Sequence, residues 1–338
     1  MRNICINMIY ELAKKDERVV FIGSDLSPGL LDKMKADFPD RYYMEGVCEA
    51  NIIGMAAGLA MEGYIPYVNT IATFITRRCY EQIAVDICMH DLPIRLIGNG
   101  GGLVYAPLGP THLAIEDISI LRPLPNMTIT AACDSNEMIR LMEASLSWPK
   151  PIYIRLAKGG DEIVSRPELN FSIGQSISLY QTNLKSPISV LLISTGIMTQ
   201  RALKIAQALE TLSVNATVLH CHTVKPLDEK TILDHAKQSS LVVTLEENTL
   251  NGGLGSAVTD CLTNILGTAI PLIKRFGIPD KFSDKYGSQE SLLEYYGLSV
   301  EKIFQAIQSI LCSHFPGYER KMEHSRARAV QAGEPVYS

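Results

Sequence analysis

The stretch of residues 42–68, YYMEGVCEANIIGMAAGLAMEGYIPYV, constrains the fold of this chain more than any other. Extended residues run up to Met44, and apolar residues then recur at helical spacing between Ile52 and Ala60. Glu49 therefore falls at a junction between a strand and a helix. Small residues at positions 54 and 56–58 leave one side of that helix almost without bulk, so another backbone can approach closely. From its position alone, Glu49 is either a functional carboxylate or a residue favoured by the helix N-terminal dipole.

The composition favours a soluble protein of two domains in a reducing compartment. The chain has 338 residues with 46% hydrophobic content, and its net charge of −5 with scattered cations gives no basic surface for nucleic acid. No apolar run approaches the ~20 residues of a membrane span, and the start has no signal-peptide core. Eight cysteines without a CxxC pair predict free thiols and a cytoplasmic location. The histidines show no ligand spacing, so the sequence predicts no metal site in this chain.

Strand and helix patterns alternate along most of the sequence. Strands are predicted at 19–22, 67–70, 92–97, 128–130 and 151–156, with helices at 3–15 and 134–148. After a polar, irregular segment, strands at 190–194, 215–219 and 241–245 alternate with helices at 199–212 and 227–238. This order predicts an α/β fold of two domains, each a mainly parallel sheet flanked by helices. The expected boundaries are a first domain at 1–160, a linker at 161–186, a second domain at 187–312 and a tail at 313–338.

Several motifs carry a resemblance to a known enzyme family. They are GVCE at 46–49 with AAGLA at 56–60, TFITRRCYEQIAVD at 73–86, GPTH at 109–112, TVKPLD at 223–228 and NGGLG at 251–255. On these motifs, residues 1–311 resemble the pyrimidine-binding and C-terminal domains of the thiamine-diphosphate enzymes related to transketolase. The resemblance implies a transferase of ketol units that takes part in carbohydrate metabolism.

The resemblance implies a role for Glu49 in activating the cofactor. In the family, this glutamate holds a ring nitrogen of the aminopyrimidine and drives it to the imino form, which removes the proton from the thiazolium carbon. Such chemistry needs a carboxyl group in a dry site. The apolar neighbours Val47, Ile52 and Ile53 would raise the pKa of this carboxyl by desolvation, while the helix dipole would lower it.

Other cofactor contacts are implied by the same motifs. Phe74 matches the aromatic residue that stacks on the pyrimidine, a role suited to a flat ring, and its alternative role is plain core packing. Asp25 matches an aspartate that supports the pocket at the subunit interface, or it caps the next turn. By register, Arg77 is expected to face the site and Arg78 to be a surface or interface charge.

The substrate side departs from ordinary transketolases. His112, in the GPTH motif, is the candidate acid/base or hydrogen-bonding group for the substrate carbonyl and hydroxyl. Lys158 stands where the family usually has a phosphate-binding arginine, and it is otherwise a solvated loop residue. Leu108 replaces an aspartate that reads a sugar hydroxyl, and Gly100 and Gly29 replace a donor-binding histidine and a phosphate-binding serine. Because such sites are built to bind hydroxyls, these losses imply an unusual donor.

One half of the family's site is missing from the sequence. These enzymes bind the diphosphate through Mg²⁺ on a separate domain with a Gly-Asp-Gly motif, and no such triplet occurs here. The resemblance therefore implies the C-terminal half of a split transketolase, with a GDG-bearing partner subunit and a homodimer of this chain inside an α2β2 heterotetramer. Alternatives are an acyl-transferring relative, either deoxyxylulose-phosphate synthase-like or a 2-oxoacid dehydrogenase beta subunit, and a non-catalytic regulatory subunit.

Overall fold

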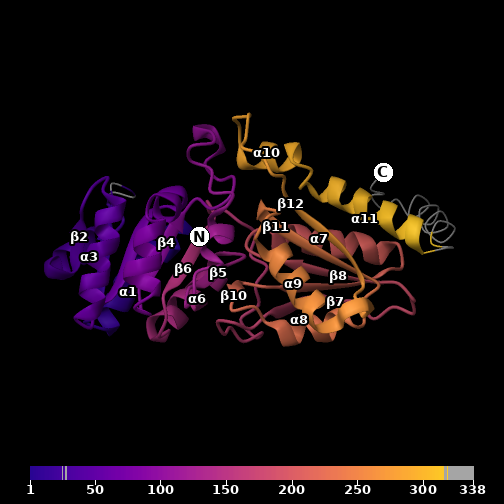
Figure 1. Ribbon diagram of the computed structural model, residues 1–338, viewed down its shortest axis with the longest axis horizontal. Coiled ribbons are helices and arrows are strands. Elements are labelled where there is room, and N and C mark those ends of the chain that lie inside the picture. Colours follow the sequence, from indigo (N-terminus) through magenta and orange to yellow (C-terminus); the bar gives the residue numbers. More distant parts are fainter. Residues whose placement is uncertain (25, 27–28, 316–317, 319–338) are drawn as a thin grey trace.

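A computed structural model describes residues 1–24, 26, 29–315 and 318 of the chain. Figure 1 shows two α/β units side by side, the first in indigo and magenta and the second in orange and yellow. Each unit is built on one mainly parallel sheet with helices on its faces, as the sequence predicts. Within this part of the chain, no helix is long and apolar enough to cross a membrane.

The first sheet has seven strands in the order β10-β5-β6-β4-β3-β1-β2. Their bounds are β1 (Val19–Gly23), β2 (Tyr42–Met44), β3 (Ile65–Ile71), β4 (Arg95–Asn99), β5 (Thr128–Ala131), β6 (Ile152–Leu156) and β10 (Thr223–Lys225). Every pairing is parallel except that of β10 with β5. Strands β1, β4 and β6 are buried along their whole length, because helices cover both faces of a parallel sheet.

Two hydrophobic clusters lie on opposite faces of this sheet. On one face, α1 (Arg2–Lys15) and α6 (Ser135–Ser147) pack through residues such as Ile9 and Leu141. On the other, α3 (Glu49–Met61) packs through Ile52 and Ile53 beside the segment that follows β3. The remaining helical elements of this unit are α2 (Asp32–Asp37), η1 (Pro39–Arg41), η2 (Phe74–Arg78), α4 (Tyr80–Gln82), η3 (Ile83–Cys88), η4 (Ala106–Leu108) and α5 (Asp117–Leu121).

The second sheet has five strands in the order β12-β11-β8-β9-β7. Its strands are β7 (Ile177–Gln181), β8 (Ser189–Ser194), β9 (Asn215–His220), β11 (Leu241–Thr249) and β12 (Leu272–Ile278). Its helical elements are α7 (Met198–Thr211), α8 (Glu229–Ala236), α9 (Leu254–Leu266), η5 (Gly267–Ala269), α10 (Gln289–Tyr295) and α11 (Val300–His314). The expected tail at 313–338 lies largely outside the described residues.

The sequence pattern did not predict β12, nor two shorter strands, β7 and β10. The expected linker at 161–186 contains β7, which pairs antiparallel with β9 and so belongs to the second sheet. Strand β10 follows β9 in the chain, yet it pairs antiparallel with β5 of the first sheet. Both are short edge strands without a long apolar run, which is why periodicity did not identify them. The exchange of β10 ties the two units together.

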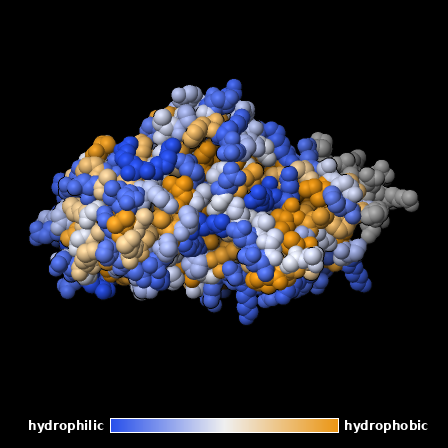
Figure 2. All heavy atoms as spheres, viewed as in Figure 1, coloured by the Kyte–Doolittle hydropathy of each residue, from blue (hydrophilic) through white to orange (hydrophobic). Residues whose placement is uncertain are grey.

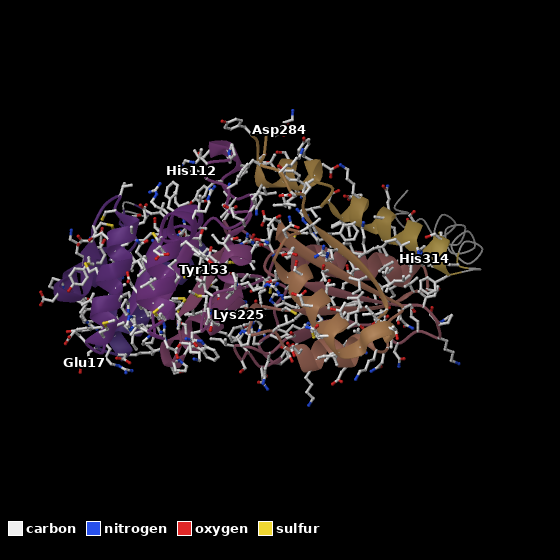
Figure 3. The ribbon with its side chains drawn as sticks, viewed as in Figure 1. Glu17, His112, Tyr153, Lys225, Asp284 and His314 are labelled. Carbon is white, nitrogen blue, oxygen red and sulfur yellow. The ribbon has the colours of Figure 1, made fainter. Side chains whose placement is uncertain are left out.

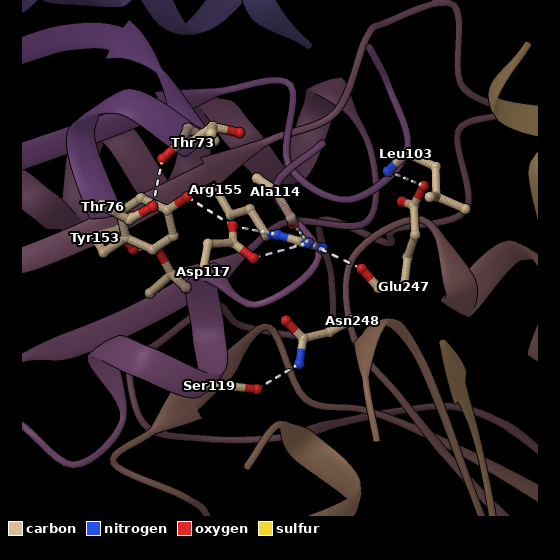
Figure 4. A network of polar contacts seen from close by, with 12 residues as sticks. Thr73, Thr76, Leu103, Ala114, Asp117, Ser119, Tyr153, Arg155, Glu247 and Asn248 are labelled. Atoms are coloured by element: carbon tan, nitrogen blue, oxygen red, sulfur yellow. Dashed lines mark hydrogen bonds and ion pairs between the residues drawn. The ribbon is translucent and has the colours of Figure 1, made fainter. Parts of the chain in front are cut away.

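A buried network of charges also joins the two units (Figure 4). Arg155 on β6 donates to both oxygens of the Asp117 carboxylate, at 2.8 and 3.0 Å, and to the Glu247 backbone carbonyl at 2.9 Å. The Glu247 side chain accepts from the Leu103 backbone at 2.9 Å. Because both Arg155 and Asp117 are buried, each needs the other to offset its loss of hydration. This network fixes the loop after β4 against the second unit.

Candidate active site

Glu49 is the first residue of α3 and one of the few buried carboxylates of the first unit. Its side chain is 2% exposed, and Cys48 before it is the helix N-cap residue. Gly46 adopts φ +74°, a conformation that favours glycine, and this turns the chain from β2 into the helix. The predicted apolar surroundings are correct for Ile52 and Ile53, which are fully buried. They are wrong for Val47, which is 66% exposed because it lies in the turn before the helix.

The Glu49 carboxylate is held by Arg78. Arg78 Nη1 donates to Glu49 Oε2 at 2.6 Å, and the Arg78 side chain is 47% exposed. Arg77 instead turns to Glu116, with 2.9 Å between Arg77 Nε and Glu116 Oε1. The register favoured Arg77 as the arginine that faces the site, whereas in the structure Arg78 is the one that contacts Glu49. The reason is local, since Phe74–Arg78 forms a π-helix, whose wider turn shifts each side chain relative to an α-helical register.

Phe74 and His112 lie next to this ion pair. The Arg78 guanidinium carbon lies 4.3 Å from the centroid of the Phe74 ring, within the range of a cation–π contact. The Phe74 and His112 rings meet edge to face, with 5.3 Å between their centroids. Both side chains are half-buried. Three segments distant in sequence thus place a carboxylate, a flat aromatic ring and an imidazole in one cluster, made of Glu49, Phe74, Arg78 and His112.

The loop carrying His112 is fixed through its backbone. The His112 amide donates to Gly109 O at 3.0 Å, and Thr73 Oγ1 donates to His112 O at 3.1 Å. His112 Nδ1 lies 2.9 Å from Thr111 Oγ1, which leaves Nε2 for other partners. Figure 3 places His112 on the same upper side of the molecule as Asp284 of the second unit. Backbone hydrogen bonds therefore hold the loop, while one imidazole nitrogen stays available.

Glu116 is a second carboxylate close to the cluster. Burial raises the pKa of Glu116, and the Arg77 guanidinium opposes this rise. Arg77 also donates to the backbone carbonyls of Thr111 and Leu113, each at 3.4 Å. Arg77 therefore braces the loop around His112 through Glu116 and these carbonyls, and it does not contact Glu49.

Gly100 and Leu108 lie on the predicted substrate side. Gly100 is buried at φ +73°, and a Cβ built there would overlap the ring of Tyr105. A histidine at position 100 would therefore force the Tyr105 ring out of its present place. Leu108, at the end of η4, is 50% exposed three residues after Tyr105. Where the family has a donor-binding histidine, this chain therefore has the Tyr105 ring packed over Gly100. Where the family has an aspartate, it has the exposed aliphatic side chain of Leu108.

Of the other predicted site residues, Lys158 shows no contact with the cluster in the described part of the chain. Lys158 is exposed in the loop after β6, near the chain start, where a Cβ on the next residue, Gly159, would lie 3.1 Å from the Met1 nitrogen. Asp25 lies outside the described residues. Sequence reasoning missed the contact of Arg78 with Glu49, and the only available signal was the pair of adjacent arginines in residues 73–86.

The residues present fit one half of a thiamine-diphosphate site. A buried carboxylate at Glu49 and a half-buried ring at Phe74 suit a heteroaromatic ring with a basic nitrogen. This cluster offers no set of oxygen ligands for the divalent cation of a diphosphate, because Glu49 is its single carboxylate and is paired with Arg78.

Comparison with known proteins gives the chain its family. The model of the transketolase pyrimidine-binding domain matches residues 1–160, and that of the transketolase C-terminal domain matches residues 184–303. The chain is 32% identical over 311 residues to the 6-deoxy-6-sulfo-D-fructose transketolase subunit SqwH of Clostridium sp. (strain MSTE9), covering 92% of this chain and 94% of that protein. The chain belongs to the transketolase family.

Other relatives within the transketolase family differ in length. A solved structure described as a split gene transketolase, inactive beta4 tetramer, superposes with a TM-score of 0.81 at 31% identity, over 91% of this chain and 97% of that one. The 1-deoxy-D-xylulose-5-phosphate synthase 1 of Geobacter sulfurreducens is 35% identical over 306 residues, or 90% of this chain but 47% of the synthase. This chain therefore matches the split subunits along almost their whole length, and it matches about half the length of the longer synthase.

Proposed function

We propose that this chain is one subunit of a two-component, thiamine-diphosphate-dependent transketolase that transfers a ketol unit between sugars or sugar derivatives. The observation that carries the proposal is the buried Glu49 carboxylate at the start of α3, clustered with Phe74 and His112. When bound, thiamine diphosphate supplies a carbon nucleophile that attacks the substrate carbonyl. The family membership supports this reading, because the matched domain is the pyrimidine-binding one.

Each residue of the cluster has a role in this proposal. Glu49 holds and moves a proton at a ring nitrogen of the aminopyrimidine, in a site from which burial excludes water. Phe74 provides a flat face for the ring. A supporting role for Asp25 is proposed from the family resemblance alone. Arg78 donates to one oxygen of Glu49 and so orients the carboxylate, leaving the other oxygen for the ring. His112 holds or moves a proton at the substrate carbonyl or hydroxyl through Nε2.

The proposal includes a partner chain. Mg²⁺ and the diphosphate would be bound by a transketolase N-terminal subunit with a Gly-Asp-Gly motif, in a cytoplasmic α2β2 assembly that contains two copies of this chain. Two observations support the division: the absence of a GDG triplet from the sequence and the match to a split-gene subunit over 97% of its length. That related structure is described as an inactive tetramer of beta chains, in line with a requirement for the other subunit.

The surface around the cluster suits a further chain. Met44 and Val47, which precede Glu49, are 40% and 66% exposed, and Leu108 before the GPTH turn is 50% exposed. Figure 2 shows several such hydrophobic areas among hydrophilic ones over the face that it presents. Exposed apolar side chains beside a half-site favour its completion by another protein surface. We propose that the GDG-bearing subunit covers Val47 and Leu108.

The donor is proposed to be a modified sugar with an anionic end. Leu108 lacks the polar atoms that would pair a sugar hydroxyl, and Tyr105 fills the space above Gly100. Unpaired hydroxyls next to Leu108 would cost binding energy. Lys158 offers one exposed positive charge to an anionic end. SqwH, a relative of similar length, is described as a transketolase subunit for 6-deoxy-6-sulfo-D-fructose.

A second candidate is condensation like that of deoxyxylulose-phosphate synthase. The favouring observation is the identity of 35% to the Geobacter sulfurreducens synthase, slightly above that to SqwH. The two reactions differ in donor, since the synthase class releases carbon dioxide from a 2-oxoacid. Product analysis of the assembled complex with both kinds of donor distinguishes them. A regulatory role is less well supported, because Glu49, Phe74 and His112 are all present.

Steady-state kinetics of the complex with its partner test the proposal. We expect transfer from sugars with a 6-sulfo or similar anionic end, and poor use of xylulose 5-phosphate and fructose 6-phosphate. Lys158→Ala should raise KM for the anionic donor with little change in kcat. Efficient use of both standard phosphates, unaffected by Lys158→Ala, would contradict the donor assignment. Release of carbon dioxide from pyruvate at a comparable rate would favour the second candidate.

A further inference from the structure

A cluster of metal-ligating side chains lies between the two units, away from the Glu49 site. Cys133 and Glu137 come from the connection between β5 and α6 and from the start of α6, and His220 is the last residue of β9. One ligand atom from each residue lies within 4.8 Å of the others, and all three side chains are buried. The residues are as much as 87 positions apart in sequence, so the fold alone brings them together.

The bonding of this cluster is incomplete. His220 Nε2 lies 2.8 Å from Glu137 Oε2, which also accepts from the Cys133 amide at 2.7 Å. The other Glu137 oxygen, Oε1, is buried without a hydrogen-bond partner among the described residues. Buried polar atoms normally have partners, so an unpaired carboxylate oxygen beside a thiol and an imidazole indicates a missing ligand.

A second imidazole, that of His222, lies beside His220. The ring of His222 has its centroid 5.8 Å from that of His220, and its Nδ1 lies 2.9 Å from Thr223 Oγ1. Its Nε2 is buried, and no partner for it exists in the described part of the chain. His220 Nδ1 is likewise occupied, 2.7 Å from Thr199 Oγ1. In both imidazoles a threonine hydroxyl contacts one ring nitrogen, and a hydrogen bond from that nitrogen helps to orient a metal-binding histidine.

We propose that Cys133, Glu137 and His220 bind a structural zinc ion between the two units, beside His222. A thiolate, a carboxylate and an imidazole suit Zn²⁺, and a shift of the His222 ring would supply the fourth ligand of its four-coordinate geometry. The two negative charges of Cys133 and Glu137 balance the charge of the ion, so no net charge is buried. On binding, the Cys133 thiol releases its proton to solvent and the sulfur bonds to zinc. Zinc also replaces the hydrogen bond between His220 Nε2 and Glu137 Oε2, and the proton of that bond moves to His220 Nδ1, which then donates to Thr199 Oγ1. The ion would join the first unit to the second close to β10, because His220 lies only three residues before that strand.

The metal content of the purified full-length chain tests this proposal. After dialysis against metal-free buffer, we expect on the order of one zinc per chain by elemental analysis, and near-background zinc in Cys133→Ser and His220→Gln. Cys221→Ser is the matched control, because this buried thiol lies between the two histidines in sequence but contacts Ser176 Oγ at 3.2 Å. We expect Cys221→Ser to keep its zinc. Zinc-free wild-type chain that also fails to take up Zn²⁺ on refolding would overturn the proposal.

Cobalt substitution keeps the test independent of variant folding. Wild-type chain refolded with Co²⁺ should show the near-ultraviolet thiolate-to-cobalt band and the intense visible bands of a four-coordinate site. Thr199→Val, which removes only the hydroxyl behind His220, should weaken Zn²⁺ affinity about 10–100-fold while circular dichroism stays unchanged. Absence of the thiolate band in wild type, or its persistence in Cys133→Ser, would show that Cys133 is not a ligand.

Discussion

The Arg78 guanidinium donates to the Glu49 carboxylate across 2.6 Å, from a π-helical turn to the first residue of α3. This contact pairs the exposed guanidinium of Arg78 with the buried carboxylate of Glu49. It also makes the two adjacent arginines unequal, since Arg77 is paired with Glu116. The first two predictions separate the role of Glu49 from that of the arginine which holds it.

Glu49→Gln should leave the fold intact but lower turnover of the assembled enzyme. Glutamine has nearly the same shape, yet it cannot exchange a proton with the aminopyrimidine. Positioned proton transfer contributes about 10²–10⁴-fold, so a loss of that size is expected in kcat. Glu45→Gln is a matched control, because Glu45 is exposed four residues earlier. A near-normal kcat in Glu49→Gln would show that Glu49 only stabilises the N-terminus of α3.

Arg78→Ala and Arg77→Ala should have different effects. Loss of Arg78 removes a charge-assisted hydrogen bond of about 1.5–3 kcal/mol that orients Glu49, so kcat/KM should fall roughly tenfold or more, with partial recovery in Arg78→Lys. Arg77→Ala should change kcat/KM less than about twofold but lower the melting temperature, because Glu116 loses its partner while half-buried. The reverse pattern of the two kinetic effects would show that Arg77 is the residue in the site.

Gly100→Ala should destabilise the chain more than Gly297→Ala. Both glycines have nearly the same conformation, φ +73° and +74°, so both substitutions cost about 1–2 kcal/mol of backbone strain. Only at Gly100 would the new Cβ also overlap the Tyr105 ring, whereas nothing lies near the Cβ position of Gly297. Urea unfolding measures the difference, and Tyr105→Ala should remove the excess. Equal losses at both glycines would mean that Tyr105 does not fill this space.

Glu246 should make stability depend on pH in an unusual direction. Burial raises the pKa of Glu246 to about 7, although its carboxylate accepts from the Leu254 and Gly255 amides, each at 2.8 Å. Because the unfolded chain releases this proton near the ordinary pKa of 4.5, the folded state binds more protons between these values. This carboxyl group therefore lowers stability progressively as pH rises from about 4.5 to 7.

The matched variant for this effect is Glu246→Gln, which cannot titrate. The difference in urea midpoint between wild type and Glu246→Gln should shift in favour of the variant as pH rises from 5 to 8. The full effect of a shift from 4.5 to about 7 amounts to about 3 kcal/mol. A difference that is the same at every pH would show that Glu246 titrates alike in the folded and unfolded chains.

The sequence predicted the parts of the fold that rest on long apolar runs. The buried strands around Val20, Ile97 and Ile154 and the strand-to-helix junction at Glu49 are confirmed, because burial on both faces leaves a clear pattern. Strands β7 and β10 were missed, since their pairing depends on the distant strands β9 and β5. The contact of Arg78 with Glu49 was missed because a π-helical turn has no signal in composition or period.

Only the site residues that belong to short sequence motifs could be predicted. Glu49, Phe74 and His112 were named from short motifs, and the structure clusters them. The group of Cys133, Glu137 and His220 could not be named, because its members share no spacing and meet only when the two units pack. Residues that share a local motif can be found from sequence, whereas residues joined only by tertiary packing cannot.

Calorimetric titration with thiamine diphosphate and Mg²⁺ tests the central claim, that this chain is half of a cofactor site. The purified chain alone should bind the cofactor weakly and show no turnover, because its cluster offers a carboxylate and a ring but no ligands for the diphosphate. Addition of the GDG-bearing partner should produce tight binding at one cofactor per pair of chains, and Glu49→Gln should weaken it. Tight, Mg²⁺-dependent binding by the single chain would contradict the account.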